Sequence, residues 1–206
     1  MNGTSEVETG CTYFVGGDPG PHGGWMAALQ EEGICVQVFP SSQRFVDEAR
    51  HDAPACVVVD VALAEAAEIL QQIRRHIKLR MPVIVLLQGA DIPTAVNFMK
   101  LGAFDLIAQP VDANDLTARI QGGIAIDRNR RSQEAERAAI NERLETLTRR
   151  ERELLSMVCN GLSNKQIAAS LGISVKTVEN HRDRVMKKTR AQNAADLVRM
   201  TLRAAG

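Results

Sequence analysis

The residues best suited to chemistry lie in a polar stretch near the carboxyl end of the chain. Residues 175–188 are expected to form a helix whose outer face carries these side chains: Glu179, Asn180, His181, Arg182, Asp183, Arg184, Lys187 and Lys188. A helix so polar, with four Lys or Arg side chains, fits the major groove of DNA and the phosphates that flank it. A solvated helix on a small bundle would have the same periodicity, so the pattern alone does not separate the two interpretations.

Short helices with clear start signals surround this stretch. Thr148 and Glu151 have the spacing of a capping box, which begins one helix. Ser163 begins a second helix, and Ser174 follows a glycine-containing turn and begins the polar third. The apolar positions expected to face inwards are Leu154, Leu155, Val158, Ile167, Ala168, Leu171, Val178, Val185, Ala195, Leu197 and Val198. Four helices, the last over residues 193–203, therefore predict a helix-turn-helix domain.

Charge is uneven along the chain, although its 206 residues carry a formal net charge of zero. Residues 1–140 contain 12 Lys+Arg and 18 Asp+Glu, a charge of −6, whereas residues 141–206 contain 13 and 7, a charge of +6. This asymmetry indicates that only the carboxyl-terminal part meets a polyanion. No catalytic constellation or metal signature is present, so no enzymatic activity, metal or cofactor is expected.

The sequence has neither a long apolar run nor a signal peptide, so the expected location is the cytoplasm, with no membrane partner.

Its four cysteines are Cys11, Cys35, Cys56 and Cys159. In a reducing compartment they are expected to be buried structural thiols. The first three would lie towards one end of the predicted sheet, so redox sensing is the alternative.

Apolar runs and helical patterns alternate through residues 1–126. The expected strands are 13–15, 34–39, 56–59, 83–87 and 106–108. The expected helices are 25–32, 42–51, 65–77, 92–101 and 113–124. Uninterrupted apolar runs are typical of strands buried on both faces of a parallel sheet. The alternation therefore predicts a doubly wound α/β domain of the flavodoxin-like or CheY-like type.

Residues 127–147 are rich in charge and in helix formers, and they contain neither Pro nor Gly. Ile140, Leu144 and Leu147 share one face of the expected helix. We interpret this segment as a helical linker that leads to a DNA-binding domain at residues 148–206. Its apolar face can dock on the second domain or pair with a twin helix, and docking within one chain is favoured.

The order of residues after the linker closely resembles the DNA-binding domain of LuxR/FixJ/NarL-type regulators. The matching motifs are L-T-x-R-E-R-E-x-L, G-L-S-N-K-x-I-A, L-G-I-S-x-K-T-V-x-x-H and A-x-L-V-R. The resemblance implies base-edge contacts from residues early in the third helix: Glu179, Asn180 and Asp183. It implies phosphate contacts from Lys165, Lys176, Thr177, Arg184, Lys187 and Lys188. His181 is expected to be structural or to lie beside a phosphate.

The first domain resembles a FixJ-type receiver of a response regulator, most clearly from Pro82 through D-I-P-T-A-V-N-F-M-K-L-G-A-F-D-L-I to Pro110. The resemblance implies a phosphoryl-accepting Asp, two acids that hold Mg²⁺, a hydroxyl and a Lys. Asp60 stands at the phosphoacceptor position. The other positions are altered, with Gly16-Gly17 for the acids, Leu87 for the hydroxyl and Gln109 for the Lys.

A glycine-rich loop follows the first predicted strand and contains Asp18 and His22. These two side chains could hold a metal, but a loop that fills a vacated metal site is favoured because two ligands are few.

The leading hypothesis is a sequence-specific, DNA-binding transcription regulator with a pseudo-receiver domain, regulated independently of Asp phosphorylation. It would act as a homodimer on two half-sites about one helical turn apart. One alternative is a two-component response regulator that a sensor kinase or another signalling protein controls through Asp60. Another is a protein-interaction adaptor whose terminal helices bind a different regulator.

Overall fold

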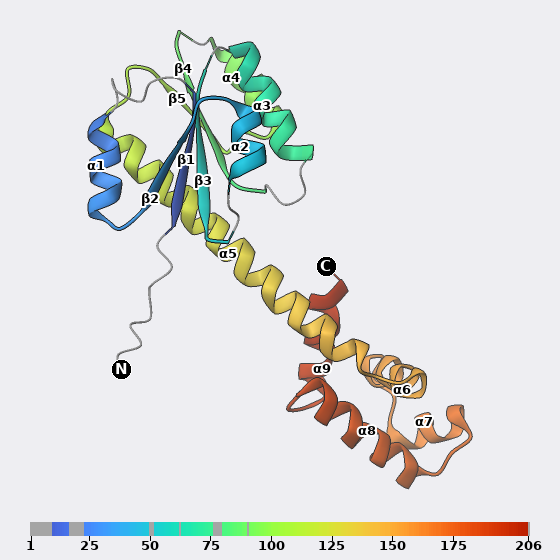
Figure 1. Cartoon of the computed structure of the whole chain (residues 1–206). Helices are drawn as coiled ribbons and strands as arrows, with labels where there is room; N and C mark the ends of the chain where they lie inside the picture. Colours follow the sequence, from blue (N-terminus) through green and yellow to red (C-terminus); the bar gives the residue numbers. More distant parts are fainter. Residues whose placement is uncertain are drawn as a thin grey trace, which may run out of the picture. The chain divides into compact units, whose positions relative to one another are not determined.

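In the computed structural model the chain forms two compact units, and the boundary between them in the sequence falls between Arg131 and Ser132. The structure describes residues 10–16, 23–49, 52–61, 63–75, 80–89 and 91–205. In the first unit, parallel strands form a five-stranded sheet with the order β2-β1-β3-β4-β5 (Figure 1). The strands are β1 (Cys11–Gly16), β2 (Cys35–Phe39), β3 (Ala55–Asp60), β4 (Val83–Leu87) and β5 (Asp105–Ala108). This order confirms the predicted doubly wound α/β fold.

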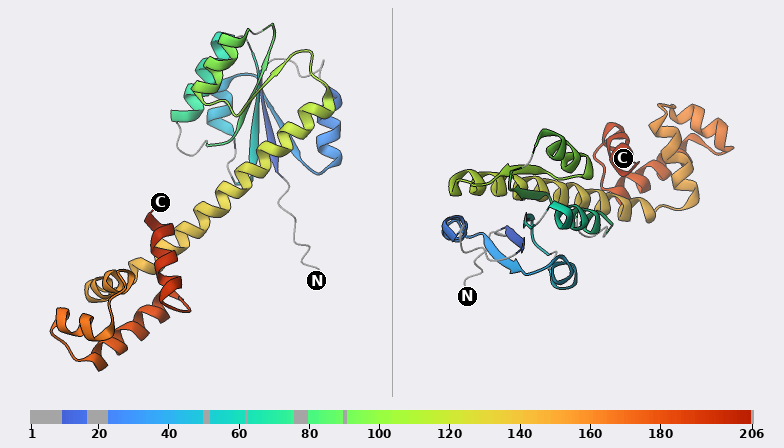
Figure 2. Two further views of the ribbon diagram at one scale, coloured as in Figure 1. Left: turned by 180° about the vertical axis from the view of Figure 1, so that it is seen from behind. Right: turned by 90° about the horizontal axis from the view of Figure 1, so that it is seen from above.

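Helices cover both faces of the sheet. They are α1 (Gly23–Glu31), α2 (Ser42–Glu48), α3 (Leu63–Arg75), α4 (Ile92–Leu101) and α5 (Ala113–Glu145). Helix α1 and the first part of α5 lie on one face, and α2, α3 and α4 lie on the other (Figures 1 and 2). The predicted helices were correct in order, and their ends within the described residues differed by at most three residues, except for α5. The predicted ends at residues 51 and 77 lie outside the described residues.

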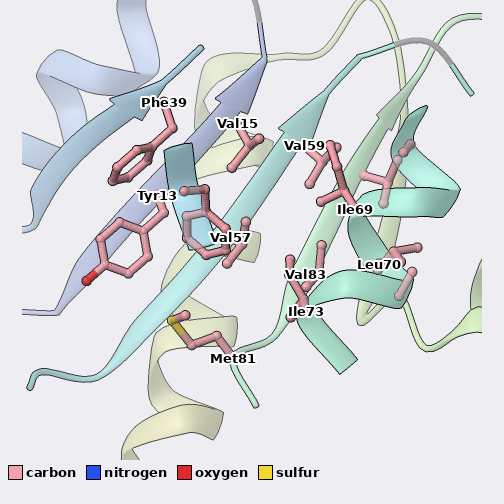
Figure 3. Close-up of a cluster of buried hydrophobic side chains, with 14 of the residues drawn as sticks. Tyr13, Val15, Phe39, Val57, Val59, Ile69, Leu70, Ile73, Met81 and Val83 are labelled. Carbon is pink, nitrogen blue, oxygen red and sulfur yellow. The ribbon is translucent and has the colours of Figure 1, made fainter. Parts of the chain in front are cut away.

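Two apolar layers result from this arrangement, because successive side chains of a strand point to opposite faces. Val57 and Val59 of β3 face α3 and its Ile69 (Figure 3). Cys56 and Val58 of the same strand face the layer that α1 and α5 cover. Burial on both faces explains why the strands appear in the sequence as uninterrupted apolar runs.

Helix α5 is longer than the sequence predicted. The expected helix 113–124 and the expected linker are one continuous helix of 33 residues. Gly123 allows this helix to pass close to β3, since a Cβ at that position would lie 2.7 Å from the Cys56 Sγ. The contact depends on residues far apart in the sequence, which a local helical pattern does not reveal.

Asp127 anchors α5 to the amino-terminal edge of the sheet. Its side chain is completely buried, and Oδ2 accepts a hydrogen bond of 3.0 Å from the Ala55 backbone N–H. Arg130 and Arg131 pair with the same carboxylate at 2.5 and 2.7 Å. Asp127 thus belongs to the α/β unit in its contacts, although the sequence prediction places it at the start of the linker.

The second unit contains the four predicted short helices: α6 (Arg149–Cys159), α7 (Asn164–Leu171), α8 (Val175–Thr189) and α9 (Ala194–Ala205). Ile140 of α5 and Leu147 are buried in the core of this unit, and Leu144 packs against that core. The prediction that this apolar face docks within the same chain is therefore confirmed. Ala195 is exposed and was wrongly expected in the core, where Met200 of the same helix is buried.

No helix in the part of the chain that the structure describes is both long enough and apolar enough to span a membrane.

Candidate nucleic-acid interface

Local capping interactions fix the geometry of α7, the turn and α8. Ser163 and Gln166 form a capping box at the start of α7. Gly172 ends that helix with φ of 65°, a left-handed conformation that glycine adopts without strain. The Ser174 side chain then accepts a hydrogen bond of 3.0 Å from the Thr177 backbone N–H and begins α8. These caps orient two successive helices in the way that a helix-turn-helix requires.

Helix α8 separates its apolar and polar side chains sharply. Val178, Val185 and Thr189 are buried in the core of the second unit. The exposed polar side chains recur every three or four residues along the opposite side: Lys176, Glu179, Asn180, Asp183, Arg184 and Lys187. We call these six residues the polar face of α8. One face of a single helix thus presents amide, carboxylate and basic groups together.

The charges on the polar face are only partly neutralised within the chain. Lys176 and Glu179 pair at 3.3 Å on the surface, where such a pair is weak. In the described residues, no ion pair involves Arg184 or Lys187. These two side chains therefore keep their positive charge available to an anion. Lys165 of α7 is also exposed.

Lys188 has a different environment from the other predicted phosphate contacts. Its Nζ lies 2.7 Å from the Glu151 Oε2 and donates to the Thr146 carbonyl oxygen at 3.1 Å. Glu151 is buried and also closes the capping box with Thr148 at the start of α6. Burial raises the pKa of Glu151, but hydrogen bonds from Lys188 and Thr148 outweigh it and hold the pKa below its ordinary value. The pair joins the start of α6 to the end of α8.

Two neighbouring residues of α8 also contact the domain itself. His181 is half-buried, and its Nδ1 is enclosed without a hydrogen-bond partner among the described residues. Arg182 donates from Nη1 to the Asn164 Oδ1 at 2.9 Å and ties α8 to the start of α7. Arg182 therefore positions α8 on α7, and the structural or phosphate-side role of His181 stays a prediction. Thr177 is half-buried beside the Ser174 hydroxyl, 2.8 Å away.

The second set of predicted site residues lies at the carboxyl edge of the sheet. Asp60 ends β3, and its Oδ1 accepts a hydrogen bond of 2.8 Å from the Gln109 Nε2. The Gln109 Oε1 in turn accepts from the Gln88 Nε2 at 3.0 Å. Gln88 was not singled out in the sequence, although its place directly after β4 is a signal that would have found it. A chain of two neutral amides therefore contacts the Asp60 carboxylate.

Gly16 ends β1 beside Asp60, with which it is in register. Its φ is 153°, and a Cβ added there would lie 2.2 Å from the Asp60 carbonyl oxygen. The backbone at position 16 therefore leaves no room for a side chain. Leu87 is buried at the end of β4, while Gly17, Asp18 and His22 lie outside the described residues.

The described residues at this edge do not fit a Mg²⁺ site. Asp60 supplies one carboxylate, and Gly16 has no side chain to offer as a ligand. No group of three or more His, Cys, Asp or Glu residues that could hold a metal ion occurs in the part of the chain that is described.

A parallel α/β unit followed by a capped helix-turn-helix unit defines a response regulator that acts on DNA. Residues 18–121 match the family described as response regulator receiver domain, and residues 145–201 match bacterial regulatory proteins, luxR family. The chain belongs to this family of response regulators with a LuxR-type DNA-binding domain.

Similar proteins cover nearly the whole chain. The transcriptional regulatory protein FixJ of Azorhizobium caulinodans is 35% identical over 176 residues, which are 84% of this chain and 83% of that protein. FixJ of Bradyrhizobium diazoefficiens is 32% identical over 197 residues, 95% of this chain and 96% of that protein. The structure of the response regulator StyR has a TM-score of 0.81 and 27% identity, and the match covers 94% of this chain and 98% of StyR.

These likenesses identify a DNA-binding transcription regulator of the response-regulator type. They favour this interpretation of α8 over a merely solvated helix and over an adaptor.

Proposed function

We propose that this transcription regulator controls its target genes without phosphorylation of Asp60. The observation that carries the proposal is the hydrogen bond of 2.8 Å that the neutral amide of Gln109 donates from Nε2 to the Asp60 Oδ1. A phosphoryl group adds negative charge, which a neighbouring ammonium group offsets better than a neutral amide. Gln88 holds Gln109 in this position, so the Asp60 carboxylate has a stable neutral partner.

The environment of Gly16 supports the same proposal. Acceptance of a phosphoryl group by a carboxylate is assisted by a divalent cation, and Mg²⁺ prefers carboxylate and carbonyl oxygens. A side chain at position 16 would collide with the Asp60 carbonyl oxygen, and no group of three or more His, Cys, Asp or Glu residues that could hold a metal occurs among the described residues. We therefore describe the first domain as a pseudo-receiver that folds, dimerises or accepts another signal.

We further propose that the polar face of α8 reads DNA in the major groove. Glu179 and Asp183 can accept from the amino group of cytosine, and Asn180 can pair with adenine. Phosphates would contact the remaining basic and hydroxyl groups: Lys165, Lys176, Thr177, Arg184 and Lys187. Lys188 would contact a phosphate only if it gave up or shared its ion pair with Glu151. Its main role in this proposal is therefore to hold α8 in place.

The proposed unit of action is a homodimer. Helix-turn-helix proteins bind two half-sites one helical turn apart, and two copies related by a two-fold axis place their recognition helices at that spacing. In this proposal residues 1–126 receive the signal, residues 127–147 connect, and residues 148–206 bind DNA.

The test is selection of the full-length protein on random duplex DNA at two salt concentrations, with and without acetyl phosphate and Mg²⁺. We expect enriched two-fold sites that are the same in both conditions, and no labelling of the protein. Asp60→Asn should bind these sites as the wild type does. Stoichiometric labelling that Asp60→Asn abolishes would show that Asp60 accepts phosphate, as would DNA binding that requires acetyl phosphate. Asp60 is half-exposed at the sheet edge, so its carboxylate is accessible for the alternative function, control by phosphorylation.

A further inference from the structure

Cysteine residues begin two neighbouring strands at the amino-terminal edge of the sheet. Cys11 is the first residue of β1 and Cys35 is the first residue of β2, and the two are directly in register. Residues in register on adjacent strands point to the same face. Both backbone N–H groups are hydrogen-bonded: the Cys11 N–H donates to the Pro54 carbonyl at 2.8 Å, and the Cys35 N–H donates to the Gly10 carbonyl at 3.0 Å.

The spacing of the strands suits a covalent link. Adjacent strands lie about 4.8 Å apart, and the Cα atoms of a disulfide are usually about 4.4–6.8 Å apart. The Cys35 thiol lies near enough to Cys11 to help raise the pKa of the Cys11 thiol. Because Cys35 opens an edge strand, its backbone can adjust by the small amount that the bond requires.

The other two cysteines do not share this arrangement. Cys56 is in register with Thr12, so it points to the opposite face of the sheet, where it is completely buried. Burial raises the pKa of its thiol, which makes it unreactive. Cys159 belongs to the second unit and contacts the Thr201 hydroxyl at 3.6 Å. The three cysteines expected at one end of the sheet are thus divided into one pair and one isolated thiol.

We propose that Cys11 and Cys35 are an oxidation site, at which a peroxide converts the two thiols into a reversible disulfide between β1 and β2. This proposal does not depend on how Asp60 behaves. It gives the α/β unit a chemical input that is separate from the carboxyl edge of the sheet.

The two thiols have different tasks in this reaction. Cys35 is exposed and meets the peroxide first, whereas Cys11 is only 5% exposed. The Cys35 sulfur displaces one peroxide oxygen as water and becomes a sulfenic acid. The Cys11 sulfur then attacks the Cys35 sulfur, the S–O bond breaks, and the departing hydroxide takes the Cys11 thiol proton to form a second water. Two thiols and one peroxide therefore give one disulfide and two waters.

The surroundings of Cys11 set the order and the speed of these steps. Burial and the contact with Cys35 raise the pKa of Cys11 to about 12. The nearby Tyr13, which lies on the same face of the sheet (Figure 3), hydrogen-bonds to this thiol. A thiol with so high a pKa is a poor first target for peroxide, so Cys11 acts as the slow resolving partner.

The direct test is peptide mapping of the full-length protein after treatment with hydrogen peroxide. We expect a peptide that contains Cys11 linked to one that contains Cys35, and the link should disappear with dithiothreitol. The proposal is overturned if both thiols remain free. It is equally overturned if Cys35 joins two copies of the chain while Cys11 stays free.

Matched variants separate the pair from the remaining cysteines. In a protein with Cys56→Ala and Cys159→Ala, peroxide should oxidise both remaining thiols. No disulfide between two copies of the chain should form. Cys11→Ala should trap Cys35 as a sulfenic acid that dimedone labels, and Cys35→Ser should leave Cys11 unmodified. Rapid oxidation of Cys11 in Cys35→Ser would overturn the assigned order. A disulfide in wild type that involves Cys56 would overturn the assigned pair.

Discussion

Asn180 and Lys187 are both exposed on the polar face of α8, yet they can contribute to DNA binding in different ways. The amide of Asn180 can donate and accept at one base edge, whereas the ammonium of Lys187 interacts with any phosphate. Asn180→Ala should cost about 1–3 kcal/mol on a selected site and relax the preference at one base pair. Lys187→Ala should weaken binding to all sequences alike and reduce the salt slope by about 1.

These effects can be measured by titrating a selected site and its single-base variants at several salt concentrations. Lys100→Ala is the matched control, because Lys100 is an exposed lysine on α4 of the other unit. It should change neither the affinity nor the salt slope. Equal weakening of all sequences by Asn180→Ala would exclude a base-edge contact at that residue.

The ion pair between buried Glu151 and partly exposed Lys188 predicts how the second unit responds to acid. The pKa of Glu151 in the folded protein lies below its ordinary value of 4.5, to which it returns on unfolding. The pair therefore stabilises the fold fully above the unfolded pKa, and this stability is lost as the pH falls through the folded pKa. Glu151→Gln should cost about 1–3 kcal/mol at neutral pH, and the difference from wild type should shrink in acid.

Urea unfolding of wild type and variant at a series of pH values from neutral to acid measures this difference. Glu153→Gln is a suitable control, since hydrogen bonds from Arg150 also hold the pKa of Glu153 below its ordinary value, but the Glu153 side chain is 39% exposed, against 4% for Glu151. An exposed pair contributes little, so this variant should change stability only slightly. A penalty for Glu151→Gln that is the same at every pH would mean that the charge of Glu151 is not what stabilises the unit.

At the scale of the elements, the helix starts of the second unit could be predicted because their causes are local. Thr148, Ser163 and Ser174 each cap the helix that follows within three residues. The true length of α5 could not be predicted in this way. It depends on the close passage of Gly123 beside Cys56, a contact that only the folded sheet creates.

The two candidate sites differ in the same respect. The polar face of α8 follows from a 3.6-residue period and was predictable, but the commitment of Lys188 to Glu151 joins residues 37 positions apart. The link from Gln109 to Asp60 spans 49 positions and joins the ends of separate strands. Sequence position identified both residues as site candidates, whereas their hydrogen bond required the topology of the sheet.

The buried interactions of Asp127 predict how much the attachment of α5 to the sheet contributes to the stability of the α/β unit. Asp127→Asn keeps the shape of the side chain but removes the charge that pairs with Arg130 and Arg131 in a buried place. We expect a loss of about 3 kcal/mol in the stability of the α/β unit. Trp25 is the one tryptophan of the chain and is buried in that unit, so its fluorescence during urea unfolding reports the change.

The control for this variant is Asp115→Asn in the same helix. Asp115 pairs with Arg119 at 3.0 Å, but both side chains are exposed, so the expected loss is below about 1 kcal/mol. Equal losses in the two variants would mean that burial adds nothing to the Asp127 interactions.

At the scale of the whole molecule, each compact unit has an apolar core of its own. Ile69 is buried between the sheet and α3 in the first unit, and Leu154 is buried among the helices of the second. Removal of a buried Leu or Ile side chain beyond Cβ costs about 2–5 kcal/mol. Because the two cores share no residue, Ile69→Ala and Leu154→Ala should each destabilise one unit only.

Calorimetry of the full chain, followed in parallel by Trp25 fluorescence, tests this independence. We expect two thermal transitions, of which the fluorescence follows one. Ile69→Ala should lower the transition that Trp25 reports, and Leu154→Ala should lower the other and leave the fluorescence midpoint unchanged. A single transition that both variants shift equally would mean that α5, which is continuous across the boundary at Arg131, couples the two cores into one cooperative unit. In that case the proposed disulfide between Cys11 and Cys35, because it would constrain the unfolded state of the first unit, would also raise the stability of the DNA-binding helices.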